Sequence, residues 1–355
     1  MQALIVGCQG SKIKSKIAFF KIKEYLLDLK KVINHVHKNG CKFGLWFEPE
    51  MISVDSNLYR EHPDFAIGGY RRRQSIHRHQ LCLDMSNPAV VDNIFEQMCK
   101  ILDNYEIDYI KWDHNRDIKE HYLPYLGDRH QGEAYHRLVL GYYDLIERIT
   151  KRYPNIMIEG CCSGGGRYDL GTLFYTPQIW TSDNSRPSAR VKIQFNTSLG
   201  YPLSTMGSHV NNSDETTYQN KAFLALFGTY GFEFNPTKIN DEDREQIKLV
   251  SEIYKKYHND VFENGTLYHL SSPSTGLMSM QVVNENKDKS VVILMKNADF
   301  NVSHVLLKGL KEDSVYLVNG NKIDGLSLME KGLFVDERKL KNNFDAELVI
   351  LEIAK

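Results

Sequence analysis

Apolar residues recur at helical spacing along the first two thirds of the chain, and short apolar runs separate these segments. In residues 17–38 the apolar positions fall on one helix face: Ile22, Leu26, Leu29, Ile33 and Val36. The Asn-Gly pair that follows predicts the end of this helix. Further helices are predicted over residues 88–105, 133–152, 216–227 and 241–257. Strands are predicted within residues 41–50, 108–113, 155–167, 177–185, 201–209 and 226–234.

The pattern changes near residue 259. From there, short alternating segments such as SVVILMK, SVYLVNG and ELVILEI are separated by Asn, Asp and Gly turns. Alternation with a period of two is typical of half-buried antiparallel strands. We therefore expect two domains, one over residues 1–258 and an antiparallel β-sandwich over residues 259–355.

The alternation of strands and helices over the first domain is compatible with a TIM-type (β/α)8 barrel or with a doubly wound sheet. A doubly wound sheet that binds a dinucleotide carries a GxGxxG motif after its first strand, and this chain has none there. A barrel collects polar residues at the C-terminal ends of many strands. Such residues follow nearly every predicted strand: Trp46, Glu48, Asp113, Glu159, Cys161, Asp183 and His209. The barrel is the favoured fold.

Composition excludes several classes of protein. The 355 residues are 42% hydrophobic and 25% charged, with a net charge of -1, so we expect neither nucleic-acid nor membrane binding. The basic run at residues 70–73 is interpreted as a solvated loop. Six cysteines without disulfide or zinc spacing, and an N-terminus unlike a signal peptide, predict a reducing, cytoplasmic location.

The strand ends offer one pair of carboxylates suited to glycoside cleavage, Asp113 and Asp183. Such cleavage needs one carboxylate as nucleophile or base and one carboxylic acid to protonate the leaving oxygen. Lys111 lies two residues before Asp113, on the same strand face, where an ammonium favours the ionised carboxylate. Trp46 could form an aromatic wall for a sugar ring.

Other interpretations of the same residues remain open at this point. A strand-end aspartate often caps the next helix or turn. The glycine run of CCSGGGR at residues 161–167 is typical of a turn, or of a loop that binds phosphate. The acids of EPE at residues 48–50 are compatible with a solvated turn. Histidines two apart at residues 35 and 37 share no helix face, which argues against a metal site there.

Several longer motifs occur in order: FGLWFEPEMISVDSNLYREHPDFAI, RHQLCLDMSNPAV, YIKWDHNRD, EGCCSGGGRYDLGTLFYTPQIWTSDNS and YPLSTMGSHV. Together they resemble the α-galactosidases of glycoside hydrolase family 36, over about residues 29–258. The resemblance implies a retaining double displacement with Asp113 as nucleophile and Asp183 as general acid/base. It also implies a sugar pocket lined by Trp46, Arg78, Lys111, Cys161 and Gly164. No metal or cofactor is implied.

The chain also departs from the family pattern. Family members carry a large β domain before the barrel and then a strand ending in Asp-Asp-Gly-Trp, whose aspartates bind the galactose hydroxyls. This sequence has no Asp-Asp pair, and only about 40 residues precede the strand at Phe43. Six barrel strands follow from there, with a further candidate at residues 3–7, whereas a closed barrel has eight. We therefore expect an N-terminally truncated member that lacks its first one or two strands.

Three interpretations of function follow from the resemblance. In the first, the chain is a retaining α-galactosidase that removes terminal α-linked galactose from oligosaccharides such as raffinose and melibiose. In the second, it is a non-catalytic remnant or subunit that needs a partner chain for the missing strands. A third interpretation is a change of specificity to another α-linked sugar. The resemblance also implies a homo-oligomer, since family members are often tetramers.

Overall fold

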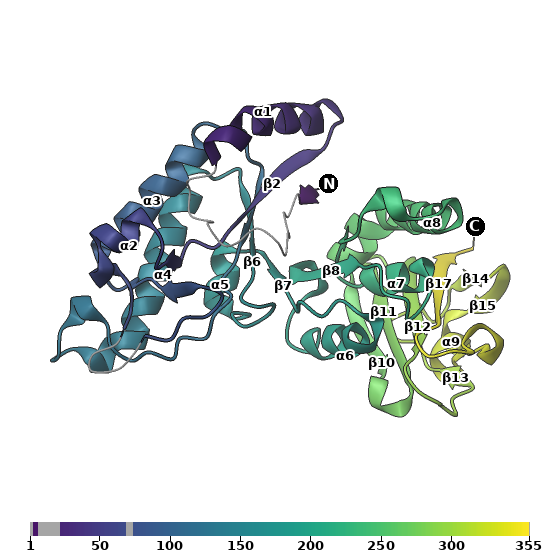
Figure 1. The fold of residues 1–355 in the computed structure, drawn as a ribbon. Coiled ribbons are helices and arrows are strands. Elements are labelled where there is room, and N and C mark those ends of the chain that lie inside the picture. Colours follow the sequence, from purple (N-terminus) through teal and green to yellow (C-terminus); the bar gives the residue numbers. More distant parts are fainter. Residues whose placement is uncertain (1–2, 6–21, 69–73, 355) are drawn as a thin grey trace. The chain divides into compact units, whose positions relative to one another are not determined.

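The computed structural model describes residues 3–5, 22–68 and 74–354 (Figure 1). The chain forms two compact units, Met1–Ile179 and Trp180–Lys355, which are described separately here. Two predicted features lie outside the described residues: the basic run at residues 70–73 and the first five residues of the helix expected over residues 17–38.

The first unit is built on a parallel sheet. Its strands lie in the spatial order β1, β2, β5, β6 and β7, and each neighbouring pair is parallel. Their bounds are Ala3–Ile5, Lys42–Phe47, Tyr109–Trp112, Met157–Gly160 and Gln178–Trp180. The strand expected near residues 3–7 is thus β1. Figure 1 shows α1 (Ile22–Lys38), α3 (Pro88–Leu102) and α4 (Ala134–Arg152) along one face of this sheet.

These helices begin and pack as their sequences predict. The side chain of Asn87 caps α3 by accepting from the Ala89 amide, and Pro88 occupies the first turn, where no amide is needed. Both α3 and α4 bury one apolar stripe against the strands. The resulting core contains Val90, Ile94, Met98, Ile110, Trp112, Leu145 and Ile158.

Shorter elements connect the strands of the first unit. Between β2 and α3 the chain forms a hairpin of β3 (Met51–Ser53) and β4 (Gln80–Cys82), with α2 (Asn57–Glu61) and a 3₁₀ turn between them. α5 (Leu170–Tyr175) separates β6 from β7. The sequence patterns did not predict the hairpin, α2 or α5, since each is too short to show a period.

The second unit begins with further strand–helix alternation. It contains α6 (Pro187–Thr197), β8 (Met206–Val210), α7 (Tyr218–Ala225), β9 (Thr229–Phe232) and α8 (Asp241–Tyr257), and β8 and β9 are parallel. A π-helical turn, η6 (His258–Glu263), leads into the last part of the chain. With the first unit, this confirms the predicted alternation of parallel strands and helices.

The C-terminal part is antiparallel, as predicted. One six-stranded sheet has the order β10, β11, β12, β17, β14 and β15. The bounds are Thr266–Ser271, Leu277–Val283, Lys289–Lys296, Ala346–Ile353, Val315–Val318 and Asn321–Asp324. A two-stranded ribbon of β13 (His304–Val305) and β16 (Leu333–Phe334), together with α9 (Gly325–Glu330), packs against one face of this sheet. The boundary proposed at residues 258/259 stays a prediction.

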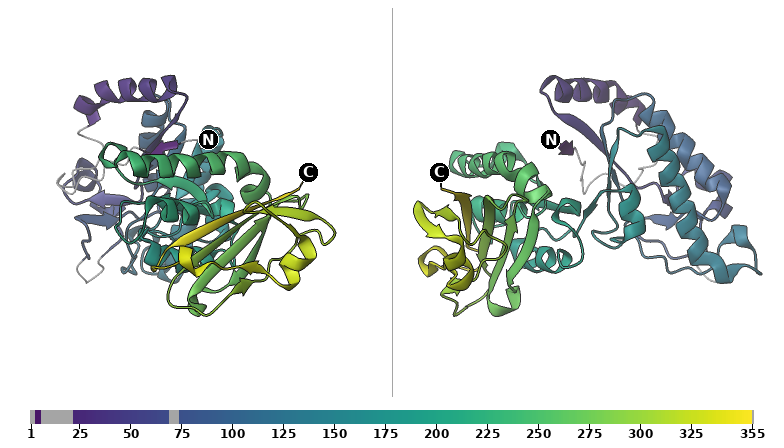
Figure 2. Two further views of the ribbon diagram at one scale, coloured as in Figure 1. Left: turned by 90° about the vertical axis from the view of Figure 1, so that its right-hand side faces the viewer. Right: turned by 180° about the vertical axis from the view of Figure 1, so that it is seen from behind.

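Both faces of the six-stranded sheet are buried at its central strands, β11 and β12. One face carries a core shared with the ribbon and α9, which includes Leu277, Val292, Leu294, Leu328 and Val349. The other face carries Met278, Met280, Ile293 and Met295, all inaccessible to solvent, on the side where β11 contacts α6. Figure 2 shows the green helices of the second unit on one side of this sheet, opposite the yellow-green segments that contain α9 and the β13–β16 ribbon. The sheet is therefore a middle layer of the second unit.

Candidate active site

The parallel register of β2, β5 and β6 brings three strand ends to one edge. Trp46 is paired with Lys111, and Lys111 with Glu159. The ladder continues past the strands, because the amide of Asp113 donates to Phe47 O at 2.8 Å and the amide of His114 to Cys161 O at 3.1 Å. Asp113 is thus held between two neighbouring strands by the backbone itself, as expected for the C-terminal edge of a parallel sheet.

The carboxylate of Asp113 is almost fully buried, with 6% of the residue exposed. Its Oδ2 accepts from Trp46 Nε1 at 3.0 Å and from the side-chain amide of Asn115. Its Oδ1 accepts from the backbone amide of His114 at 2.8 Å. Three donors fix the orientation of this carboxylate and satisfy several of its lone pairs, which a helix-capping role would not require.

Lys111 is buried beside a second carboxylate. Its Nζ lies 3.1 Å from Oε1 of Glu159. Glu159 is inaccessible to solvent, and its Oε2 accepts from Tyr109 OH at 2.6 Å. Burial alone would lower the pKa of Lys111, but the charge and hydrogen bond of Glu159, together with other nearby groups that include Asp113, outweigh burial, so the pKa is raised. Lys111 therefore remains a cation close to both carboxylates.

The acids of the EPE segment are buried, so their interpretation as a solvated turn is wrong. Glu50 is 5% exposed and accepts from Trp112 Nε1 at 3.1 Å and from the Arg167 guanidinium at 2.7 Å. Burial alone would raise the pKa of Glu50, but the charges of Arg167 and His114 and their hydrogen bonds hold it well below its usual range. The opposing charge of Glu50 likewise raises the pKa of Arg167.

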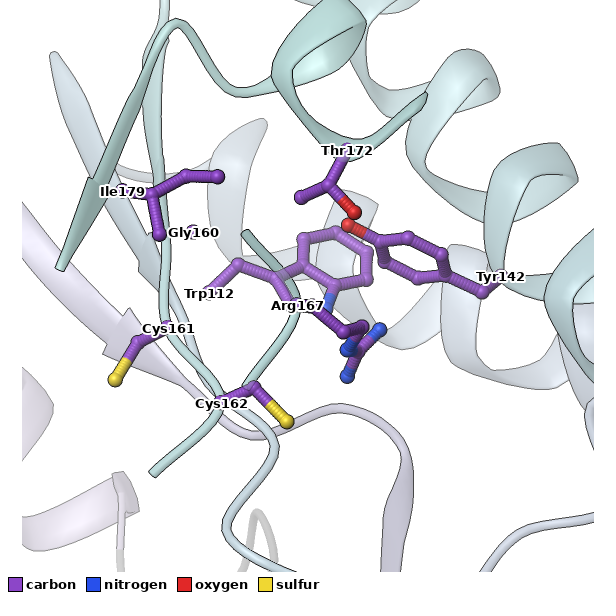
Figure 3. Close-up of a pocket in the computed structure, with 8 residues that line it drawn as sticks. All are labelled: Trp112, Tyr142, Gly160, Cys161, Cys162, Arg167, Thr172 and Ile179. Atoms are coloured by element: carbon purple, nitrogen blue, oxygen red, sulfur yellow. The ribbon is translucent and has the colours of Figure 1, made fainter. Parts of the chain in front are cut away.

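The glycine loop after β6 forms a tight turn next to this ion pair. Gly164 has a φ of +87°, a left-handed conformation that favours glycine, and the Cys162 amide donates to Gly164 O at 2.8 Å. Figure 3 shows Cys161 and Cys162 pointing away from each other, with the Arg167 guanidinium beside Tyr142 and Trp112. The guanidinium lies 4.4 Å from the Tyr142 ring centroid. Burial raises the pKa of the Cys161 thiol, which is therefore neutral.

The small pocket drawn in Figure 3 lies beside Trp112, the last residue of β5. Its lining combines the buried indole with the ion pair and the glycine loop: Trp112, Tyr142, Gly160, Cys161, Cys162, Arg167, Thr172 and Ile179. Of the residues expected to contact the sugar, only Cys161 lines it.

Asp183 lies in the second unit, in the segment after β7. Its Oδ1 accepts from Trp180 Nε1 at 3.0 Å. The Trp180 ring lies 4.5 Å from the His209 ring and 4.6 Å from the Arg190 guanidinium. Each predicted catalytic aspartate therefore accepts a hydrogen bond from an indole. For retention, the two carboxyl groups should stand about 5–5.5 Å apart, and this separation stays a prediction.

The remaining predicted site residue, Arg78, lies in the β3–β4 turn, and its guanidinium is 3.0 Å from Oε1 of Glu48. Sequence reasoning placed Glu48 and Glu159 among the strand-end residues but gave them no partners, and it missed Glu50 and Arg167.

Within the described ranges, no group of three or more His, Cys, Asp or Glu residues could hold a metal ion. No helix of the described part is long and apolar enough to cross a membrane.

Comparison with protein-family models gives two matches in chain order. The melibiase model matches residues 18–265, and the model of the glycosyl hydrolase family 36 C-terminal domain matches residues 277–351. Alpha-galactosidase Mel36A of Lactobacillus acidophilus is 45% identical over 313 residues, which are 85% of this chain and 42% of that protein. The bifunctional alpha-galactosidase/sucrose kinase AgaSK of Mediterraneibacter gnavus is 42% identical over 317 residues. The chain spans less than half the length of these two relatives.

Solved structures agree with these matches. The GH36 alpha-galactosidase AgaA of Geobacillus stearothermophilus superposes with a TM-score of 0.86 at 34% identity, covering 92% of this chain and 46% of that one. Variants of AgaA have been solved in complex with stachyose, raffinose and 1-deoxygalactonojirimycin. An alpha-amylase of Geobacillus thermoleovorans shares the fold at 13% identity, with a TM-score of 0.60.

Proposed function

Because the chain belongs to the melibiase family, glycoside hydrolase family 36, we propose that it carries the catalytic residues of a retaining α-galactosidase. The proposed reaction releases terminal α-linked galactose from oligosaccharides of the raffinose and melibiose type. The observation that carries the proposal is the carboxylate of Asp113, buried at a strand end and held by donors on both oxygens.

In the first proposed step, a carboxylate oxygen of Asp113 attacks the anomeric carbon of the galactose. The bond from that carbon to the glycosidic oxygen breaks, and its electron pair stays on the departing oxygen. Asp183, as the carboxylic acid, gives its proton to this oxygen, and a galactosyl ester of Asp113 is left. The Trp46 indole and the Asn115 side-chain amide both donate to Oδ2 of Asp113. These two contacts support the step because they keep the other, attacking oxygen in one orientation.

In the second proposed step, the Asp183 carboxylate takes a proton from water. The water oxygen attacks the anomeric carbon and the ester bond to Asp113 breaks, which returns both carboxyl groups to their starting forms. Two inversions at the same carbon give net retention. The charge of Lys111 supports the release of Asp113 as a carboxylate, since a neighbouring cation stabilises the anionic leaving group.

We assign the contacts to the sugar to Trp46, Arg78, Lys111, Cys161 and Gly164. Trp46 would serve both as an aromatic wall and as the donor to Asp113. Gly164 lets the backbone approach the ring closely, since it lacks a Cβ. Cys161 would contact the sugar as a neutral thiol.

Raffinose and related α-galactosides are the proposed substrates because AgaA variants, at about one third identity, bind raffinose and stachyose. We also propose the cytoplasm as the compartment, supported by the free thiols of Cys41, Cys82, Cys99, Cys161 and Cys162. A homo-oligomer is part of the same proposal and is tested by light scattering of the purified chain.

Hydrolysis of a nitrophenyl α-galactoside by the purified chain and by its Asp113→Asn variant tests the function. We expect the variant to lose at least about 10³-fold in kcat, because the covalent step has no nucleophile. Asp144→Asn, an exposed aspartate of α4 that pairs with Arg148, serves as the matched control and should keep full activity. Proton NMR should show the α-anomer of galactose formed first.

Three outcomes would contradict the proposal. Equal activity of the Asp113→Asn variant would remove Asp113 from the mechanism. Formation of the β-anomer first would show inversion instead of retention. A folded wild-type chain without activity would mean that these residues alone do not make the enzyme.

A further inference from the structure

The turn that carries Arg78 is held in an unfavourable backbone conformation. His77 and Gln80 exchange two backbone hydrogen bonds, of 3.1 and 2.9 Å, around a two-residue turn. Arg78 and His79 have φ values of +53° and +62°, a left-handed conformation at both central positions. Turns of this kind are usually made by Asn and Gly. Strained backbone of this sort persists where the surrounding structure fixes it, and it is common at functional sites.

Two contacts fix this turn. At its base, the guanidinium of Arg116 donates to Gln80 O at 2.9 Å. At its tip, the guanidinium of Arg78 donates to Oε1 of Glu48 at 3.0 Å. The Glu48 side chain is only 4% exposed, whereas that of Arg78 is 47% exposed. A buried carboxylate therefore holds a cation whose outer part faces solvent.

The same oxygen of Glu48 also contacts the loop that carries Asp113. Glu48 Oε1 accepts from the backbone amide of Asn115 at 3.2 Å. The side-chain amide of Asn115 in turn donates to Oδ2 of Asp113. One carboxylate oxygen thus joins the Arg78 turn to the segment that orients Asp113, although the two lie in separate loops.

We propose that Glu48 is a positioning residue that couples sugar binding by Arg78 to the orientation of Asp113. The inference rests on the proposed function, since it takes Arg78 as a sugar contact and Asp113 as the nucleophile. Glu48 itself touches neither the sugar nor the reacting carbon. It holds the Arg78 guanidinium in place before the substrate arrives, which reduces the entropy lost on binding.

Two substitutions separate the two contacts of Glu48. Glu48→Gln keeps an oxygen for the Asn115 amide and removes the charge that holds Arg78. We expect KM for the nitrophenyl α-galactoside to rise roughly tenfold while kcat changes by less than about twofold, because only binding is affected. Glu48→Ala removes both contacts and should lower kcat as well, since Asn115 and Asp113 lose their orientation.

Binding of 1-deoxygalactonojirimycin, measured by calorimetry, gives a readout without turnover. We expect the Glu48→Ala variant to bind roughly tenfold more weakly than wild type. Because Glu48→Gln disturbs only the contact with Arg78, adding it to Arg78→Ala should weaken binding no further. Glu133→Gln, which breaks an exposed ion pair with Arg137 at 2.8 Å on the same unit, is the matched control and should bind as wild type.

A purely structural role predicts different results. Glu48→Gln would then lower the melting temperature and the amount of active protein, with KM unchanged, and that outcome overturns the inference. Additive losses in the double variant also overturn it. If wild type binds and hydrolyses the substrate while Glu48→Gln matches it, the inference fails and the proposed function stands. If wild type neither binds nor hydrolyses, both fail together.

Discussion

Replacing Arg167 with methionine tests whether the buried ion pair with Glu50 holds the strand ends of the first unit together. The substitution keeps much of the apolar stem and removes the cation. It breaks a 2.7 Å charged hydrogen bond, worth about 1.5–3 kcal/mol, and a contact over the Tyr142 ring, worth about 1 kcal/mol. We expect the free energy of unfolding to fall by about 3 kcal/mol at neutral pH, in line with other broken buried pairs.

The pH dependence of this loss has a definite sign. In the wild type the pKa of Glu50 is lowered in the folded state, so its contribution to stability is complete above the unfolded value near 4.5 and is lost as the pH falls below it. Without Arg167, only the charge and hydrogen bond of His114 oppose the effect of burial, so we expect the pKa of Glu50 to rise. The folded variant then gains stability on protonation. The difference between the two proteins should therefore shrink between about pH 7 and about pH 4.

Urea unfolding followed by tryptophan fluorescence measures this difference, because Trp112 is buried and donates to Glu50. Arg152→Met provides the control, since Arg152 pairs with Asp103 at 2.9 Å with both side chains about half exposed. Exposed pairs contribute little, so its loss should be much smaller at every pH. A loss under about 1 kcal/mol for Arg167→Met, or a loss equal at both pH values, would refute the reasoning.

Two further predictions concern the acid and the packing of α4. Asp183→Asn should lower kcat/KM for melibiose by about 10²–10⁴-fold but affect kcat/KM for a nitrophenyl α-galactoside much less, because nitrophenolate leaves without a proton; equal losses in kcat/KM would remove Asp183 as the acid. Gly141→Ala would place a Cβ 1.7 Å from Met85 O and should cost about 1–3 kcal/mol in urea unfolding. Gly132→Ala, with no heavy atom within 4 Å of its Cβ, should be nearly neutral, and a similar loss in both would contradict the packing argument.

The sequence predicted the elements whose signal is local. Six strands from Phe43 onward appear as β2 and β5 to β9, and the predicted helix at residues 88–105 is α3, Pro88–Leu102. α6 was missed because its pattern is weak: polar Arg190 and Gln194 are buried beside Val191 and Phe195. Gln194 donates to two carbonyls about 30 residues away, a stabilisation that no local pattern reveals.

The candidate site was predicted unevenly for the same reason. Asp113 was found because a charged residue directly after an apolar strand is conspicuous in the sequence. Glu48 and Glu50 were also compatible with a solvated turn, since their partners are distant: Arg78 is 30 residues from Glu48, and Arg167 is 117 residues from Glu50. Whether an acid is solvated or paired depends on these tertiary contacts, which composition and periodicity do not encode.

The middle position of the antiparallel sheet limits how this family can exchange parts. Its methionine-rich face meets α6, and Asp345, just before β17, accepts from Asn220 in α7. A C-terminal domain grafted from a relative at the 258/259 boundary would have to match this surface side chain by side chain. Chimeras that carry α6 and α7 together with the donor's own sheet would keep the interface intact. Recombination should therefore succeed more often at a crossover before α6 than at the visible change of sequence pattern.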